Sequence, residues 1–386
     1  MQKSIFYPLI LILFFSFIPY SLSADSLYLN VRIFAHRNIK TITIVPAQGK
    51  YQVFSQDKQV SELSKSITTT FKVLGKKIKM AKLDATIGIF DTIRLVPENG
   101  ECLLKVRNGK EERKYQDYLK LYVSGGELYM INHVELENFV AGAVLSEAGA
   151  GKSTEFYKIQ CMISRTYAIR NMRKHELEKF HQCDQVHCQL YRGVCTNRDV
   201  LEALLDTRGL VIVDSAGGPI SAAFHSNSGG ETTNSEDVWS LQSPYLRSIK
   251  DTFSSTMPMA CWEKRIPAKE WLNYLKVKYK YPINDSVKRS QALHFKQKDR
   301  KKNFGDTIPL KNIRSDFNLK STYFDIIPDG DILIFKGKGF GHGVGLSQEG
   351  AINMVNKGYN FEEIIKFYYK DVRIAPFDTS MIPRKK

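Results

Sequence analysis

After its N-terminal segment, the sequence has no apolar run long enough to cross a membrane. It also has no helix-turn-helix, zinc-finger or RNP-type motif, so its 56 Lys and Arg against 40 Asp and Glu do not indicate a nucleic-acid-binding protein. A His-Glu-x-x-His sequence and a Gly-x-Ser-x-Gly sequence are both missing, which disfavours a zinc hydrolase and a serine hydrolase. We therefore expect a soluble body whose partners do not include nucleic acid.

The N-terminal segment itself predicts export. Lys3 precedes an almost wholly apolar stretch at 5–18, and small residues at 21–24 offer a signal-peptidase site. Because the apolar stretch is short and contains Pro8, we expect a cleaved signal peptide at 1–24, with an N-terminal membrane anchor as the alternative. The protein would then lie in the periplasm or cell envelope.

The charge of the mature chain predicts anionic partners. Removing the signal peptide costs only Lys3, which changes the net charge from +16 to about +15. An exported protein of this charge attracts anionic polymers over several ångströms of water. A charge excess that serves only solubility is the alternative.

The hydrophobic pattern divides the chain into a β-rich region at 25–114 and a mixed region at 115–373. In the first region, β-branched and aromatic segments alternate with turn residues. After residue 138 the spacing of apolar residues becomes helical. We therefore expect an α+β fold with a basic tail at 374–386. The expected strands are 27–34, 41–45, 87–96, 119–123, 210–213 and 220–225, and the expected helices are 138–148, 155–174 and 201–207.

Residues 264–320 are strongly charged and form a predicted basic insertion or subdomain. We expect one helix at 268–279, followed by an exposed basic segment. After the insertion, a hairpin of 322–327 and 332–335 turns at Pro328-Asp329-Gly330. Two closing helices are predicted to begin at the N-caps Ser347 and Asn360.

Glu147 is the candidate catalytic residue. It stands at the end of the predicted helix 138–148, which Gly149 and Gly151 terminate. The negative end of the helix dipole and partial burial both favour the protonated carboxyl, which is the form that a general acid needs. An ordinary Glu exposed at a frayed helix end is the alternative. The apolar face that Glu147 continues contains Leu136, Val140, Ala143 and Val144.

Five alternating glycines occupy 337–345. In an extended chain this spacing removes side chains from one face and lets a ligand or another backbone approach closely. The opposite face would present Lys338, Phe340, His342, Val344 and Leu346. The spacing does not match a nucleotide-binding fingerprint. Ligand approach and tight packing of two structural elements both remain open.

Two further segments carry polar chemistry. The loop at 224–232 concentrates hydrogen-bond donors, acceptors and glycines, which suits a hydroxyl-rich ligand or, alternatively, a loop that satisfies its own hydrogen bonds. Cys183 and Cys188, with His187 or else His181, supply three zinc ligands. A disulfide or free buried thiols are the alternatives for the two cysteines.

These segments and several others resemble the SpoIID/LytB family, which contains stage II sporulation protein D and amidase enhancers. The resemblance runs from about residue 115 to 373, with weaker agreement before it. Several separate motifs in the same order make it specific. The motifs lie at 132–140, 146–147, 164–168, 187–193, 223–232, 238–239, 244–246 and 339–351.

The resemblance implies a lytic transglycosylase that cleaves peptidoglycan glycan strands already stripped of stem peptides. Glu147 stands at the position of the family's catalytic glutamate, and a zinc site at 183–188 occurs in some members. The chemistry itself needs no cofactor. Ser228 stands where many relatives have cysteine, and Cys161 replaces a usual alanine. The residues expected to bind the strand are Arg165, Tyr167, His225, Ser226, Ser228, Gly229, Gly230, His342, Gly343, Ser347 and Gln348.

A transglycosylase can use a single carboxyl group, because the nucleophile is the 6-hydroxyl of the substrate sugar and proximity replaces a second enzyme group. The peptide-free strand keeps the lactyl carboxylates of its muramic acid, so the positive charge of the protein suits it. A non-catalytic enhancer that binds wall glycan and stimulates a separate N-acetylmuramoyl-L-alanine amidase is the main alternative. Glu147 beside Arg165-Thr166-Tyr167 favours catalysis.

Overall fold

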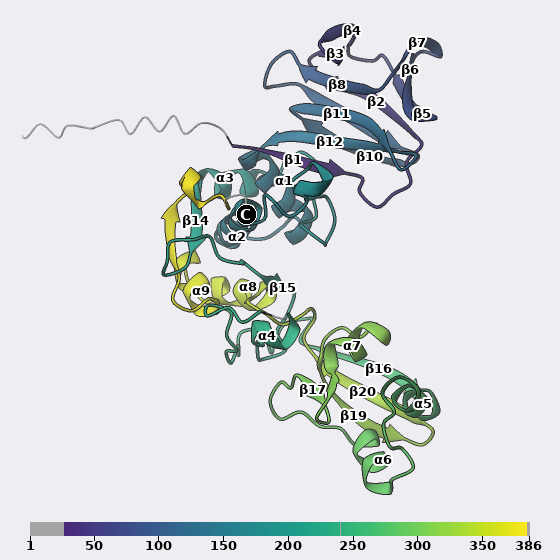
Figure 1. The fold of residues 1–386 in the computed structure, drawn as a ribbon. Helices are drawn as coiled ribbons and strands as arrows, with labels where there is room; N and C mark the ends of the chain where they lie inside the picture. Colours follow the sequence, from purple (N-terminus) through teal and green to yellow (C-terminus); the bar gives the residue numbers. More distant parts are fainter. Residues whose placement is uncertain (1–26, 240, 384–386) are drawn as a thin grey trace, which may run out of the picture.

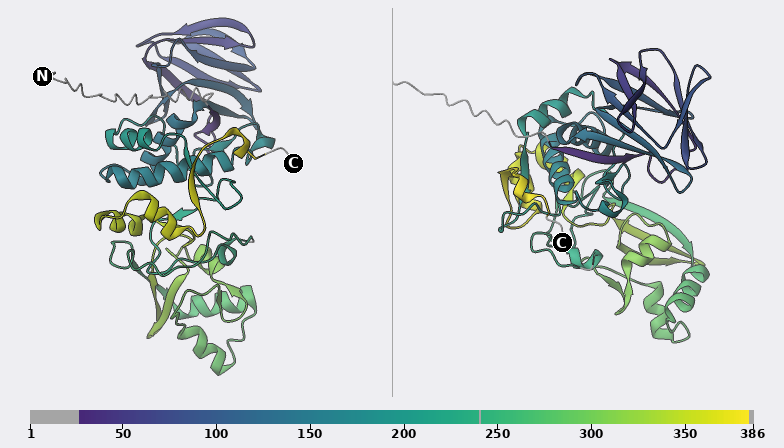
Figure 2. Two further views of the ribbon diagram at one scale, coloured as in Figure 1. Left: turned by 90° about the vertical axis from the view of Figure 1, so that its left-hand side faces the viewer. Right: turned by 45° about the horizontal axis from the view of Figure 1, so that its top comes forward.

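The computed structural model describes residues 27–239 and 241–383, so the predicted signal peptide at 1–24 lies outside the described residues. The chain forms an N-terminal β domain, a central body rich in helices, and a subdomain at the far end (Figures 1 and 2). Among the described residues, every helix is too short or too polar to span a membrane. The α+β expectation is confirmed.

Two sheets pack face to face in the N-terminal domain, with one continuous core that includes Val53, Leu121 and Phe71. The seven-stranded sheet has the order β13 (Gln182–Cys183), β1 (Tyr28–Ile33), β12 (Glu127–Glu135), β11 (Tyr118–Ser124), β8 (Thr92–Pro97), β3 (Tyr51–Ser55) and β4 (Lys58–Leu63). The six-stranded sheet has the order β10 (Glu111–Gln116), β9 (Leu103–Asn108), β2 (Thr41–Gln48), β5 (Thr69–Leu74), β6 (Lys77–Lys82) and β7 (Ala85–Phe90).

One strand prediction in this domain was wrong. The segment 87–96 is not a single strand, because the exposed Asp91 separates β7 from β8 and the two belong to different sheets. A continuous β-branched pattern does not reveal a corner at which the chain changes sheets.

The central body forms around α2, which is buried on nearly all sides as its apolar middle indicated. The Ser153 side chain accepts a hydrogen bond from Phe156 N and caps α2. The predicted strand 220–225 shortens to β15, which pairs in parallel with β21. The body contains α1 (Leu136–Ala148), α2 (Thr154–Arg170), η1 (Glu176–Glu178), α3 (Arg198–Asp206), β14 (Leu210–Val213), β15 (Phe224–His225), α4 (Ser235–Val238), β21 (Leu346–Ser347), α8 (Gln348–Asn356), α9 (Phe361–Tyr368), β22 (Arg373–Pro376) and η2 (Thr379–Met381).

The two closing helices begin where their caps predicted. Ser347 accepts a hydrogen bond from Gly350 N at the start of α8, and Asn360 forms a capping box with Glu363 at the start of α9. These local signals needed no tertiary information.

The subdomain at 261–338 corrects the expectation of an exposed basic segment. Apolar residues between the lysines, including Phe295, Phe304 and Leu310, pack around Trp271 in a separate core. The high content of charged residues led to a prediction that overlooked these apolar positions. The subdomain contains β16 (Cys261–Pro267), α5 (Ala268–Tyr279), α6 (Ser286–Leu293), β17 (Asn303–Phe304), β18 (Ile308–Pro309), α7 (Leu310–Asp316) and the hairpin of β19 (Tyr323–Asp329) and β20 (Ile332–Lys338).

Candidate functional site

Glu147 lies in the last turn of α1, which Gly149 terminates. Leu190 N donates a hydrogen bond of 2.7 Å to Glu147 Oε1. Burial raises the pKa of the Glu147 carboxyl, and the Leu190 hydrogen bond and the charge of Arg192 offset this only in part. The direction of the shift agrees with the expectation from its position at the end of an apolar helix face.

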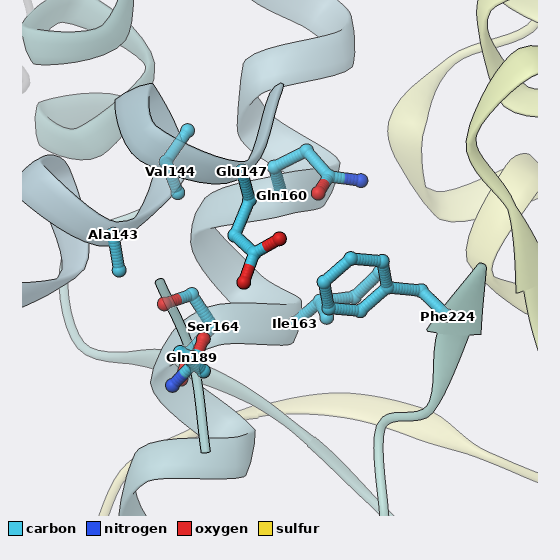
Figure 3. Close-up of a pocket in the computed structure, with 8 residues that line it drawn as sticks. All are labelled: Ala143, Val144, Glu147, Gln160, Ile163, Ser164, Gln189 and Phe224. Atoms are coloured by element: carbon cyan, nitrogen blue, oxygen red, sulfur yellow. The ribbon is translucent and has the colours of Figure 1, made fainter. Parts of the chain in front are cut away.

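Side chains from α1 and α2 surround the carboxyl group of Glu147 (Figure 3). Gln189, in a loop, and Phe224, in the short strand β15, complete the enclosure. Two buried polar atoms here, Gln160 Nε2 and Ser164 Oγ, have no hydrogen-bond partner among the described residues. Buried polar groups that lack a partner are uncommon in folded proteins, and these two lie beside the carboxyl group of Glu147.

A cleft of about 540 Å³ extends from Glu147 across the body. Among the described residues that line it, Glu147 is the only one with a carboxyl group. The opposite wall contains Trp239 and His342, whose rings are 5.2 Å apart. Burial, with nearby Arg314 and Arg300, lowers the pKa of His342 to about 4, so its imidazole is neutral at neutral pH. Tyr167, Asn171, Lys174, Val186, His187, Cys188, Ser221, Ala222, Ala223 and Phe224 complete the lining.

Four candidate metal ligands meet at one end of this cleft. His175, Cys183, His187 and Cys188 place their ligand atoms within 4.8 Å of one another. His187 Nδ1 is 3.9 Å from Cys183 Sγ and 3.8 Å from Cys188 Sγ, and His175 Nε2 is 3.3 Å from Cys188 Sγ. A tetrahedral zinc site with Zn–S of about 2.3 Å and Zn–N of about 2.0 Å separates its ligands by similar distances.

The surroundings of the four ligands also fit a metal. Glu178 Oε1 lies 2.6 Å from His175 Nδ1, the carboxylate–imidazole contact that orients metal-bound histidines. Both cysteines are free thiols, and the hydrogen bond from Cys188 lowers the pKa of Cys183, which favours a thiolate. His181, the alternative ligand from sequence, is not in the cluster, because its Nδ1 accepts from Asn30 N at 3.1 Å. Sequence reasoning missed His175, which only the turn at η1 brings back to the cysteines.

Of the five alternating glycines, Gly337 lies in strand β20 as expected, but the other four are not in an extended strand, which corrects the geometry assumed from sequence. Gly339, Gly341, Gly343 and Gly345 have φ values of +74°, +116°, +84° and +69°. A Cβ at Gly345 would lie 2.2 Å from Ala223 O, and one at Gly341 would lie 2.7 Å from His225 Cβ. Gly339, Gly341 and Gly345 therefore allow tight packing on residues 223–229, the alternative that the sequence left open, whereas Gly343 faces Arg300.

Arg165 does not face the cleft. It is fully buried and pairs with Glu137, so it joins α2 to α1. The structure thus gives Arg165 a packing role where sequence predicted contact with a ligand.

The loop at 224–232 satisfies most of its own hydrogen bonds. His225 Nδ1 donates to Val344 O, and Ser228 Oγ donates to Asp251 Oδ2. Ser226 O accepts from Glu349 N, and Gly229 N donates to Asn227 Oδ1. Burial lowers the pKa of His225 well below its usual range. The polar groups of this loop are thus hydrogen-bonded both within the loop and to Asp251, Val344 and Glu349.

The remaining candidates divide between the cleft and the core. Tyr167 and His342 line the cleft, and Gln348 Nε2 donates to Gln160 Oε1 beside Glu147. Ser347 is buried as the cap of α8, Gly343 lies against Arg300, and Gly230 N donates to Ser228 Oγ. Trp239, missed as a candidate although it lies in a segment that resembles the family, lines the cleft as well.

Comparisons with known proteins cover the segment that contains Glu147. The family model described as stage II sporulation protein matches residues 124–213, which contain both Glu147 and the metal-ligand cluster. Stage II sporulation protein D of Bacillus subtilis is 28% identical over 264 residues, covering 64% of this chain and 76% of the relative. The amidase enhancer of Bacillus subtilis is 26% identical over 293 residues, covering 61% of this chain and 40% of the relative.

A longer match spans both flanking domains. An uncharacterized protein of Brachyspira hyodysenteriae is 24% identical over 367 residues, covering 90% of this chain and 96% of that one. In its motifs, its match to the family model and its relatives, the chain is similar to the SpoIID/LytB family.

Proposed function

We propose that this chain acts on the bacterial cell wall as a lytic transglycosylase, cleaving peptide-stripped glycan strands with Glu147 as its single acid and base. The observation that carries the proposal is the cleft in which Glu147, with a raised pKa, is the only carboxyl group among the described lining residues. Relatives named for sporulation and for amidase enhancement support a role in the wall.

A single carboxyl group suits this reaction better than hydrolysis. Most glycoside hydrolases use two carboxyl groups on either side of the scissile bond. Here the protonated Glu147 gives its proton to the glycosidic oxygen as the bond to C1 breaks. The resulting carboxylate then takes the proton of the 6-hydroxyl of the same sugar as that oxygen bonds to C1, which closes a 1,6-anhydro ring and restores the acid.

Two other acidic residues near the loop at 224–232 are unsuited to the acid role. Glu231 is within 3.0 Å of Lys250 Nζ. The hydrogen bond from Arg247 lowers the pKa of Glu236 to about 2, so Glu236 stays ionised at neutral pH. Neither residue lines the cleft of Glu147.

The opposite wall of the cleft supplies contacts for the sugar rings. Trp239 is 40% exposed, and its indole offers an apolar face to a pyranose ring. The same lining includes the Tyr167 hydroxyl and the ring of neutral His342. We propose these three residues as the glycan-binding part of the site.

We propose that His175, Cys183, His187 and Cys188 hold one structural zinc ion. When bound, zinc would fix the loop at 175–188 against the cleft and take no part in the cleavage. A closed set of four protein ligands is typical of structural sites, because catalytic zinc keeps a position open. The protein residues alone carry the chemistry.

The alternative function is a glycan-binding enhancer of an N-acetylmuramoyl-L-alanine amidase, which the name of one relative favours. In either case we propose an exported protein of the periplasm or cell envelope. An amidase would also prepare the substrate of the first function, since it removes the stem peptides from the strands.

Mass spectrometry of the products from peptide-stripped strands tests the proposal. We expect the wild-type chain to release fragments ending in 1,6-anhydromuramic acid, and Glu147→Gln to lose about 100- to 10,000-fold of this activity. Glu236→Gln is the matched control and keeps activity. A wild-type chain that releases no such fragment but binds strands and stimulates an amidase establishes the enhancer instead. Equal activity of Glu147→Gln and wild type rules out Glu147 as the acid.

A further inference from the structure

The positive charge of the chain is confined to its two flanking domains. Residues 27–135 hold 18 Lys and Arg against 11 Asp and Glu, and residues 261–338 hold 18 against 9. The remaining residues, which include the body around Glu147, hold 20 of each. The residues outside the two flanking domains therefore have no net positive charge with which to attract a polyanion, whereas each flanking domain does.

The N-terminal domain has a groove of about 850 Å³ on the outward face of its seven-stranded sheet. On β11, Tyr118, Lys120 and Tyr122 alternate with buried leucines, so all three point into the groove. Lys120 stands opposite Arg94 of β8, and Tyr118 stands opposite His133 of β12.

Cations dominate the polar lining of this groove. Lys76, Lys120 and Lys179 line it and form no ion pair within the described part of the chain. Asp91 is the only acidic residue among the described lining residues, and Lys77 lies 3.4 Å from its carboxylate. The groove thus combines aromatic rings with uncompensated positive charge.

This groove adjoins the cleft of Glu147. A small apolar cluster of Ala35, Ile131, Phe180, Cys183 and Cys188 separates the two. Tyr122 of the groove and Tyr167 of the cleft both pack against this cluster. A chain-like ligand that leaves the cleft past Cys188 therefore meets the groove next.

We propose that the groove around Lys120 is a second binding site for the anionic glycan strand, beyond the cleft. The proposal rests on the proposed function and extends it to a substrate class, strands with free carboxylates. The tyrosine rings suit the apolar faces of sugar rings, and the lysines suit the lactyl carboxylates. Neighbouring strands are about 4.8 Å apart, so two strand spacings are comparable to one disaccharide repeat.

Binding of peptide-stripped, labelled strands to the whole chain carrying Glu147→Gln tests the groove without cleavage. We expect Lys120→Gln to weaken binding about tenfold, the equivalent of one charge-assisted hydrogen bond. Lys110→Gln, at an exposed turn of the same domain, is the matched control and leaves affinity unchanged. Strands whose carboxylates have been amidated are expected to bind both variants equally.

Three results would contradict the proposal that this groove binds the glycan strand. One is equal binding of the Lys120→Gln and Lys110→Gln variants. The second is a loss of affinity in a Lys288→Gln variant of the subdomain but not in Lys120→Gln. The third is an effect of Lys120→Gln on phosphatidylglycerol vesicles with none on strands. If the wild type releases no 1,6-anhydro products, the proposed reaction is wrong. The binding comparison of Lys120→Gln with Lys110→Gln would still show whether the groove binds the strand.

Discussion

Arg165 of α2 and Glu137 of α1 form a bidentate ion pair in the core, with Arg165 Nε 2.8 Å from Glu137 Oε1 and Nη2 2.6 Å from Oε2. Arg165 Nη1 also donates to Leu210 O of β14. The guanidinium group therefore connects three elements of the body beneath the cleft.

Removing this arginine should destabilise the fold. Arg165→Ala leaves the Glu137 carboxylate buried and unpaired, so we expect a loss of about 3–5 kcal/mol in the free energy of unfolding. The exposed pair of Arg208 with Glu135 is the control, and Arg208→Ala should cost less than about 1 kcal/mol. Urea unfolding measures both. Comparable losses in the two variants would contradict a special role for the buried pair.

The raised pKa of Glu147 predicts a pH-dependent stability difference. An unfolded Glu loses its proton near pH 4.3, at about the usual value, whereas folded Glu147 keeps it to higher pH. Stability of the wild type therefore falls as pH rises from the unfolded pKa to the folded one. Because Glu147→Gln carries no charge, its melting temperature should match the wild type near pH 4 and exceed it at pH 8.

A control variant isolates this effect. Glu236→Gln removes a carboxylate whose pKa is lowered to about 2 by the Arg247 hydrogen bond. The Glu236→Gln variant should therefore be less stable than the wild type at pH values above the usual pKa of a glutamate. If the melting temperature of the wild type instead rises relative to that of Glu147→Gln with increasing pH, folding lowers the pKa of Glu147.

The cluster at the end of the cleft predicts which histidine binds metal. His175→Ala should lower the zinc content, measured by elemental analysis, from about one ion per chain and should lower the melting temperature. His181→Ala is the matched control, because His181 lies outside the cluster, and it should keep its zinc. Zinc loss in His181→Ala with none in His175→Ala would contradict the assignment.

The glycine segment predicts a difference between two glycines with similar backbone angles. Gly358 has φ of +88° and open space where a methyl group would lie, so Gly358→Ala should cost about 1 kcal/mol from backbone strain alone. Gly345→Ala adds a collision with Ala223 O and should cost about 1–3 kcal/mol more. Chemical denaturation measures both, and equal costs would contradict tight packing at Gly345.

Local signals in the sequence determined several elements on their own. The caps Ser347 and Asn360 fixed the starts of α8 and α9, and helix 268–279 matches α5. The turn at Pro328-Asp329-Gly330 falls where β19 and β20 meet. The raised pKa of Glu147 was also foreseeable, since an apolar helix face buries whatever residue continues it. The caps, the helix and the turn depend on residues within a turn or two of one another, whereas the burial of Glu147 is completed by distant segments.

The tertiary structure alone decided what these elements meet. Only the folded chain brings Trp239 and His342 across the cleft from Glu147, and only the turn at η1 returns His175 to the cysteines. It also decided that Arg165 faces the core. Sequence spacing predicts which face of a helix or strand a side chain occupies, but the partner of that face depends on long-range packing between distant segments.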